Sequence, residues 1–124
     1  MSGIRPDELA DRLESEASDN PFLLDIRPRA SFQSNAIENS HNVPVYDELQ
    51  SGDEAALRNR LDEIPTDRDV IVVCKMGMVA KRATSLLRAE DYDATTLLGG
   101  MSGWNGYQND SLGYKLRSIL WKIL

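Results

Sequence analysis

The chain has very few of the side chains that most often build reactive or metal-binding sites: it contains one cysteine, Cys74, and one histidine, His41. A single cysteine cannot form an internal disulfide, so the fold does not require an oxidising compartment. A cysteine-rich or histidine-rich zinc site is excluded as well, because such sites take several of these ligands. We therefore expect neither a metal nor a cofactor.

Long apolar runs are also missing from the sequence. No stretch approaches the ~20 apolar residues of a membrane-spanning helix. The first residues, MSGIRPDELADRL, are acidic and lack the apolar core of a signal peptide. A chain of 124 residues is long enough to bury a core without disulfides or metals. These features predict a cytoplasmic protein.

Lysine is scarce, with four lysines against ten arginines, and the 20 acidic residues leave a net charge of −6. This balance disfavours nucleic acid as a partner. An acidic, lysine-poor surface is consistent with a cytoplasm of high salt concentration, where hydrated carboxylates keep proteins in solution. The alternative is an acidic protein without such an adaptation.

The pattern of apolar residues predicts strands and helices that alternate along the chain. Strands are predicted over 22–26, 41–46 (as far as Pro44), 69–73 and 94–98, and helices over 5–14, 51–64 and 78–90, with one helical turn over 27–34. Such alternation is typical of parallel strands joined by right-handed crossovers. We therefore predict an α/β fold: a single domain with a central, mainly parallel sheet and helices on both faces.

Ligands of such sheets bind beyond the carboxyl ends of the strands. Asp25 and Arg27 follow one predicted strand, Cys74 follows another, and Gly99 and Gly100 follow a third. The topology therefore predicts that these residues meet at one edge of the sheet.

Cys74 ends the apolar run VIVV, and the next residues turn into the predicted helix at 78–90. The backbone N–H groups of such a turn and the N-terminus of the helix together attract anions. A cysteine sulfur at that place is stabilised as a thiolate, and Gly77 allows the positive φ that a tight loop needs. Position alone leaves two interpretations open, a buried core cysteine or a nucleophile.

Two familiar cysteine chemistries fit the spacing poorly. A cysteine–histidine hydrolase needs a base, and His41 lies in a short predicted strand with no motif around it. A cysteine phosphatase needs an arginine six positions after the nucleophile, where this chain has Ala80. A loop with one thiol and no base fits sulfur transfer better, because the thiolate itself attacks a sulfane sulfur.

Four segments, LLDIRPRASF, AIENSHNVPV, VIVVCKMGMVA and LLGGMSGW, occur in an order that resembles single-domain rhodaneses, a family of persulfide-forming sulfurtransferases. The resemblance covers roughly residues 4–107. It implies a rhodanese-like fold and a catalytic Cys74 that carries sulfur as a persulfide to a nucleophilic acceptor. It implies a substrate-binding loop of Lys75, Met76, Gly77, Met78, Val79 and Ala80, with supporting roles for Asp25, Arg27, Lys81 and Arg82.

The chain departs from the family pattern at several positions. Val79 stands where the family often has an arginine, and Ser31 stands where it has an acid, which removes the usual partner of Arg27. The loop then keeps one cation and presents an apolar mouth, where Met76 and Met78 either line the pocket or dock a partner. We therefore expect the sulfur donor to be a protein or organic persulfide rather than free thiosulfate. The alternative is that Lys75 and the backbone amides suffice to bind thiosulfate. The alternative function is a catalytically weak rhodanese-like module that binds a partner or senses oxidants.

The last residues are predicted to form an amphipathic C-terminal helix outside the rhodanese-like domain, with the domain over 1–108 and the extension over 109–124. Asp110 or Ser111 can cap this helix. Its apolar face contains Leu112, Leu116, Ile119, Leu120 and Ile123, and its cations are Lys115, Arg117 and Lys122. Three interpretations stay open for 111–124: packing on the chain's own surface, contact with a partner or second copy, or binding to an anionic membrane surface.

Overall fold

The computed structural model describes residues 3–15 and 20–110. Its centre is a five-stranded, entirely parallel sheet in the order β1-β5-β4-β2-β3. The strands are β1 (Gly3–Ile4), β2 (Phe22–Asp25), β3 (His41–Asn42), β4 (Val70–Val73) and β5 (Ala94–Leu97). The VIVV sequence of β4 places it in the middle, because four β-branched side chains suit a strand that is buried on both faces.

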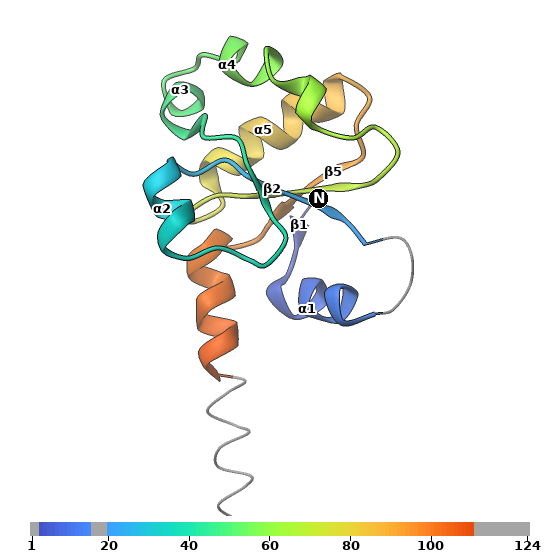
Figure 1. The fold of residues 1–124 in the computed structure, drawn as a ribbon, viewed down its shortest axis with the longest axis vertical. Helices are drawn as coiled ribbons and strands as arrows, with labels where there is room; N and C mark the ends of the chain where they lie inside the picture. The colour runs from blue at the N-terminus through green and yellow to red at the C-terminus, as the bar shows by residue number, and fades with distance from the viewer. Residues whose placement is uncertain (1–2, 16–19, 111–124) are drawn as a thin grey trace, which may run out of the picture.

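Helices cover both faces of the sheet, as the alternation of elements predicted. They are α1 (Pro6–Glu14), α2 (Arg29–Ser34), α3 (Tyr46–Gln50), α4 (Ala55–Arg58), the 3₁₀ helix η1 (Leu61–Glu63), α5 (Met78–Ala89) and a last helix over 100–110. Figure 1 shows α3, α4 and α5 on one side of the sheet and α1 with the helix 100–110 on the other. The expected α/β architecture is confirmed. No helix within the described residues is long and apolar enough to cross a membrane.

The sheet separates the core into two buried clusters. Leu24 and Val72 point toward α5 and pack in one cluster, whereas their neighbours Leu23, Ile71 and Val73 belong to the other, under α1 and the helix 100–110. This division follows from the strand geometry, because successive side chains point to opposite faces. Cys74 continues the alternation and lies in the cluster on the α5 side.

The prediction of one helix over 51–64 is wrong. The segment contains two short pieces, α4 and η1, and a further helix that the sequence did not predict, α3, precedes it. Gly52, with φ +93°, follows the end of α3. The hydroxyl of Tyr92 lies 3.0 Å from the carbonyl oxygens of Leu61 and Ile64, so a residue far along the chain holds the end of this segment.

The helix 100–110 was also not predicted, because its glycine-rich start reads as a turn. Met101 and Trp104 lie on its inner face and are buried, which is the i, i+3 spacing of a helix packed on a core. The amphipathic helix expected over 111–124 lies outside the described residues, and the domain boundary at 108/109 stays a prediction.

Candidate active site

Cys74 lies directly after β4, at the carboxyl edge of the sheet. Its side chain is almost completely buried, with 1% of the residue exposed. The sulfur accepts hydrogen bonds from two backbone N–H groups, of Gly77 at 3.0 Å and of Ala80 at 3.4 Å. The loop between β4 and α5 therefore surrounds the sulfur with N–H donors, which favours negative charge on it.

Gly77 gives this loop its shape. Its φ of +93° lies in the left-handed region, where glycine carries no steric penalty, and it immediately precedes the first residue of α5. The space around it is also tight, because a Cβ at this position would lie 3.2 Å from the backbone nitrogen of Gly99. Both features explain why the sequence has glycine three residues after the cysteine.

The start of the helix 100–110 holds the other side of the loop. The N–H of Met101 donates to the carbonyl oxygen of Cys74 at 2.8 Å, and the N–H of Ser102 donates to that of Lys75 at 3.1 Å. These donors are free at a helix N-terminus, because they have no partner within the helix. A Cβ on Gly100 would lie 2.3 Å from the Cys74 oxygen. The prediction that Gly99 and Gly100 meet Cys74 at this edge of the sheet is confirmed, whereas the hydrogen bonds from Met101 and Ser102 were not predicted.

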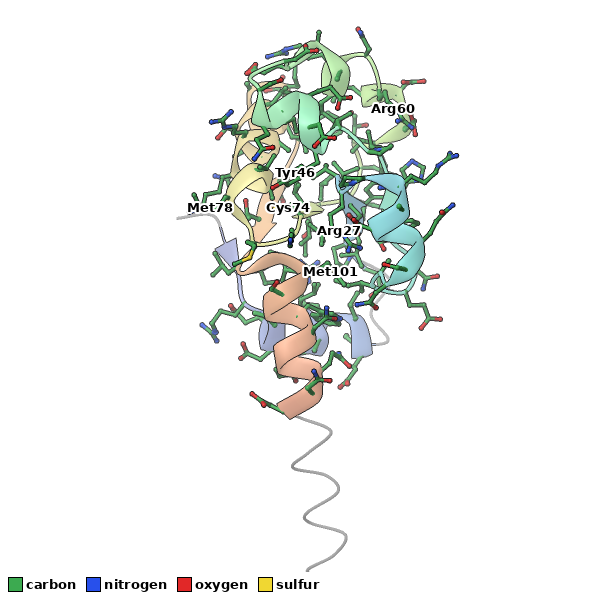
Figure 2. All side chains as sticks on the ribbon, turned by 90° about the vertical axis from the view of Figure 1, so that its left-hand side faces the viewer. Arg27, Tyr46, Arg60, Cys74, Met78 and Met101 are labelled. Atoms are coloured by element: carbon green, nitrogen blue, oxygen red, sulfur yellow. The ribbon has the colours of Figure 1, made fainter. Side chains whose placement is uncertain are left out.

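The rim of the site is apolar and positively charged. Met76 and Met78 are the exposed large apolar side chains of the described residues, at 61% and 73%. Lys75 and Lys81 are exposed beside them. Figure 2 shows Tyr46, Met78 and Met101 around Cys74, and Tyr46 packs against the same buried cluster as the cysteine.

Two residues expected at the site, Val79 and Arg82, have structural roles instead. Val79 is 7% exposed and belongs to the core cluster under α5, so it does not contribute to the apolar mouth as expected. Arg82 donates to the carbonyl oxygens of Leu49 and Gln50 at 2.9 and 3.2 Å, and so connects α5 to the last residues of α3. The mouth is therefore formed by Met76 and Met78 without Val79.

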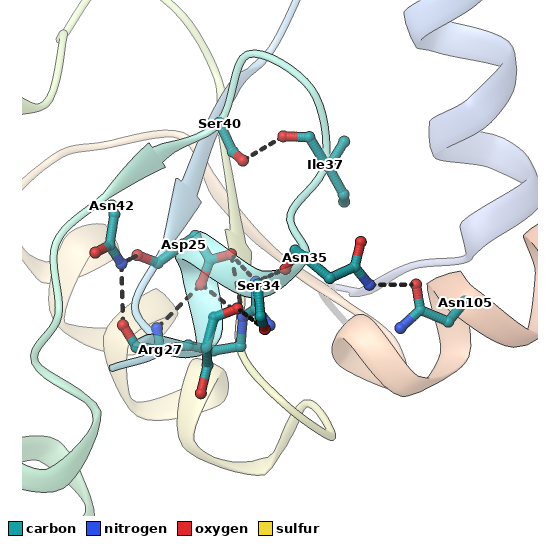
Figure 3. A network of polar contacts seen from close by, with 9 residues as sticks. Asp25, Arg27, Ser34, Asn35, Ile37, Ser40, Asn42 and Asn105 are labelled. Carbon is teal, nitrogen blue, oxygen red and sulfur yellow. Dashed lines mark hydrogen bonds and ion pairs between the residues drawn. The ribbon is translucent and has the colours of Figure 1, made fainter. Parts of the chain in front are cut away.

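Asp25 and Arg27 form a buried ion pair beside the site. The Arg27 guanidinium donates through Nε at 3.0 Å and Nη2 at 2.8 Å to the two carboxylate oxygens, and Nη2 also donates to the carbonyl of Asn35. The Asn42 side chain donates to the carbonyl oxygens of Asp25 and Arg27, and Asn35 donates to Asn105 on the last helix, as Figure 3 shows. The acid that the family pattern has at position 31 is absent, and Asp25 is the partner of Arg27 in its place.

His41 lies on the edge strand β3, where its Nε2 is 2.9 Å from Oε1 of Glu63. Glu63 also accepts from Arg60, and these two contacts, that of Arg60 first, lower the pKa of Glu63 to about 2. His41 thus makes its contact on the surface, and the two hydrogen bonds that Cys74 Sγ accepts come from the backbone N–H groups of Gly77 and Ala80. A cysteine–histidine pair does not form between the described residues.

A thiol in this setting has donors for a negative charge, and no side chain of residues 3–15 and 20–110 hydrogen-bonds to it as a base. That arrangement suits a reaction in which the sulfur attacks an atom with a good leaving group and needs no proton transfer at the site. The depth of the sulfur restricts the reacting group to a narrow one. Lys75 on the rim supplies one positive charge close to the entrance.

Comparison with known proteins identifies the same family that the motifs indicate. The model of the rhodanese-like domain matches residues 5–107. A sulfurtransferase of Allochromatium vinosum is 28% identical over 84% of this chain and 88% of its own length. The adenylyltransferase and sulfurtransferase MOCS3-2 of Zea mays is 34% identical over 67% of this chain, which spans 17% of the length of that protein.

The fold comparison agrees. The rhodanese-related protein of Thermoplasma volcanium superposes with a TM-score of 0.70 over 86% of this chain and 93% of its own, at 20% identity. At 20% identity this similarity supports the fold alone. The link to sulfur transfer rests on the relatives found by sequence. With a family match that spans most of the described residues, the chain belongs to the rhodanese-like domain family, whose members include sulfurtransferases.

Proposed function

We propose that this chain is a sulfurtransferase in which Cys74 carries sulfane sulfur as a persulfide. The observation that carries the proposal is the pair of backbone N–H groups, of Gly77 and Ala80, that point at Cys74 Sγ. Such donors stabilise a terminal sulfur of negative charge, which supports this proposal. Membership of a family that includes sulfurtransferases supports this reaction class.

The reaction takes place in two displacement steps. The Cys74 thiolate attacks the outer sulfur of a donor, the S–S bond of the donor breaks, and the electron pair leaves with the donor thiolate, or with sulfite when thiosulfate is the donor. An acceptor nucleophile then attacks the outer sulfur of the Cys74 persulfide and regenerates the thiolate. No external oxidant or reductant is needed, since each step exchanges one sulfur bond for another.

A protein or organic persulfide suits the entrance better than free thiosulfate as the donor. Thiosulfate is a dianion, and a guanidinium binds such an oxyanion through two parallel hydrogen bonds. The loop has Val79 in the core instead of an arginine at the mouth, and Lys75 is its one cation. We expect a high KM for thiosulfate, and a KM in the micromolar range with fast transfer to cyanide would contradict this choice of donor.

Intact-mass spectrometry after incubation with polysulfide, thiosulfate or a protein persulfide tests the persulfide step. The wild-type chain is expected to gain the mass of one sulfur atom, which dithiothreitol removes. The Cys74→Ser variant is the matched control, because it keeps the loop and the size of the side chain but lacks the thiol. No adduct with any of the three donors would reject the enzyme and leave a rhodanese-like module that binds a partner or senses oxidants.

A further inference from the structure

We propose that the sulfur group exchanged at Cys74 is carried on an extended, acidic polypeptide segment with apolar side chains, which docks on the rim formed by Met76, Met78, Lys75 and Lys81. This inference rests on the proposed function, and it assigns a partner class to the same site. It is argued from the apolar surface, the charge and the depth of the sulfur.

The apolar part of the rim is unusual for this surface. Met76 and Met78 are 61% and 73% exposed, whereas the other large apolar side chains of residues 3–15 and 20–110 are at least partly covered. Met76 Sδ lies 3.9 Å from the hydroxyl of Ser102, and Met78 is the first residue of α5, so the methionines border the two helix starts that flank the loop. Flexible, polarizable methionine side chains adapt well to an apolar partner.

The charge of the rim is opposite to that of the rest of the chain. Lys75 and Lys81 together carry +2, so by difference from the overall −6 the rest of the chain carries −8. Within the described residues, Lys75 and Lys81 have no carboxylate within ion-pair distance. The positive charge at the entrance is therefore available to a partner, and it attracts acidic chains while the remaining surface repels them.

The depth of Cys74 determines the shape of the partner. With 1% of the residue exposed, the sulfur is out of reach for a flat protein surface. An extended segment can insert a cysteine side chain while its neighbouring residues lie on the rim. Its apolar side chains then contact Met76 and Met78, and its carboxylates lie near Lys75 and Lys81.

Transfer from the preloaded Cys74 persulfide to synthetic thiol peptides tests the docking rim. The peptides are short, end in cysteine and contain leucine together with glutamate, glutamine or lysine at matched positions, and cyanide serves as the small acceptor. We expect kcat/KM for the glutamate peptide to exceed that for the lysine peptide by about tenfold or more at low salt, and this ratio to shrink as ionic strength rises.

Variants of Lys81 and of the two methionines test separately how charge and apolar contact contribute to transfer to the peptides. Lys81→Glu is expected to lower the glutamate-to-lysine peptide ratio several-fold, while Arg68→Glu changes the net charge equally at the opposite end of β4 and is expected to leave the ratio within about twofold. The double variant Met76→Ser/Met78→Ser is expected to lower the ratio of peptide to cyanide transfer about tenfold.

The outcomes are distinguishable from failure of the sulfurtransferase proposal. If no persulfide forms on preloading, the function itself is rejected, and the docking inference with it. If the persulfide forms but the lysine peptide reacts as fast as the glutamate peptide, or only cyanide reacts, the docking inference is overturned while the function stands.

Discussion

Replacing Gly100 by alanine is expected to displace the reactive loop without changing the cysteine. A Cβ at this position would lie 2.3 Å from the carbonyl oxygen of Cys74 and 2.7 Å from the carbonyl carbon and oxygen of Lys75. Real Cβ atoms essentially never approach closer than 3.0 Å, and both neighbours are backbone atoms. The loop and the helix start must therefore separate by roughly 1 Å, which weakens the 2.8 Å hydrogen bond from Met101 to Cys74.

Gly100→Ala is expected to lower both the stability of the fold and the rate of persulfide formation. Gly100 has φ +56°, where a side chain costs about 1–2 kcal/mol, and the weakened hydrogen bond adds about 1 kcal/mol. A misplacement of about 1 Å at a reactive group lowers rates by roughly 10²-fold. We therefore expect Gly100→Ala to remain folded, with a lower unfolding midpoint and a first-order rate of persulfide formation reduced about 10²-fold.

Gly52→Ala is the matched control. Gly52 also has a positive φ, +93°, but a Cβ there meets nothing within 4 Å. Gly52→Ala therefore has the energetic cost of a positive φ but no close contact with the loop of Cys74, so its rate of persulfide formation is expected to equal that of the wild type. Rapid-quench intact-mass measurements give the rates, and urea unfolding with circular dichroism gives the stabilities. A folded Gly100→Ala variant that reacts as fast as Gly52→Ala would refute the positioning argument.

Three further predictions concern stability. Asp25→Asn leaves the buried Arg27 guanidinium without its carboxylate and is expected to lower the free energy of unfolding in urea by about 3–5 kcal/mol. Adding Arg27→Met to this variant should restore part of the lost stability. If the losses of the two single variants simply add up in the double variant, the two side chains are not directly coupled. The pKa of Glu63 is lowered from 4.5 to about 2, and that of Asp69 is lowered by Arg12, so both carboxylates stabilise the fold at neutral pH. Stability should therefore fall as the pH drops from about 4.5 toward 2, and an equal acid dependence in Glu63→Gln would contradict the assignment. If the net charge of −6 reflects adaptation to high salt, the melting temperature should rise in molar potassium chloride, whereas an unchanged melting curve would reject that adaptation.

Much of the candidate site was predictable because it depends on local sequence. The VIVV run, the following cysteine and the glycine three residues later define a buried strand, a turn and a helix start within one short segment. Most contacts that the sequence missed join distant segments. One local contact was overlooked as well: Asp25 pairs with Arg27, two residues further along, but the motif directed attention to position 31.

The sequence by itself determined the alternation of strands and helices, the parallel sheet and the position of Cys74 at its carboxyl edge, because these follow from the periodicity of apolar residues and from the geometry of parallel strands. Only the tertiary structure decided the short helix α3, the division of 51–64, the burial of Val79 and the contact of the helix 100–110 with the loop. Short helices have little stability of their own and depend on packing. The hydrogen bond between Met101 and Cys74 joins residues that only the folded sheet brings together.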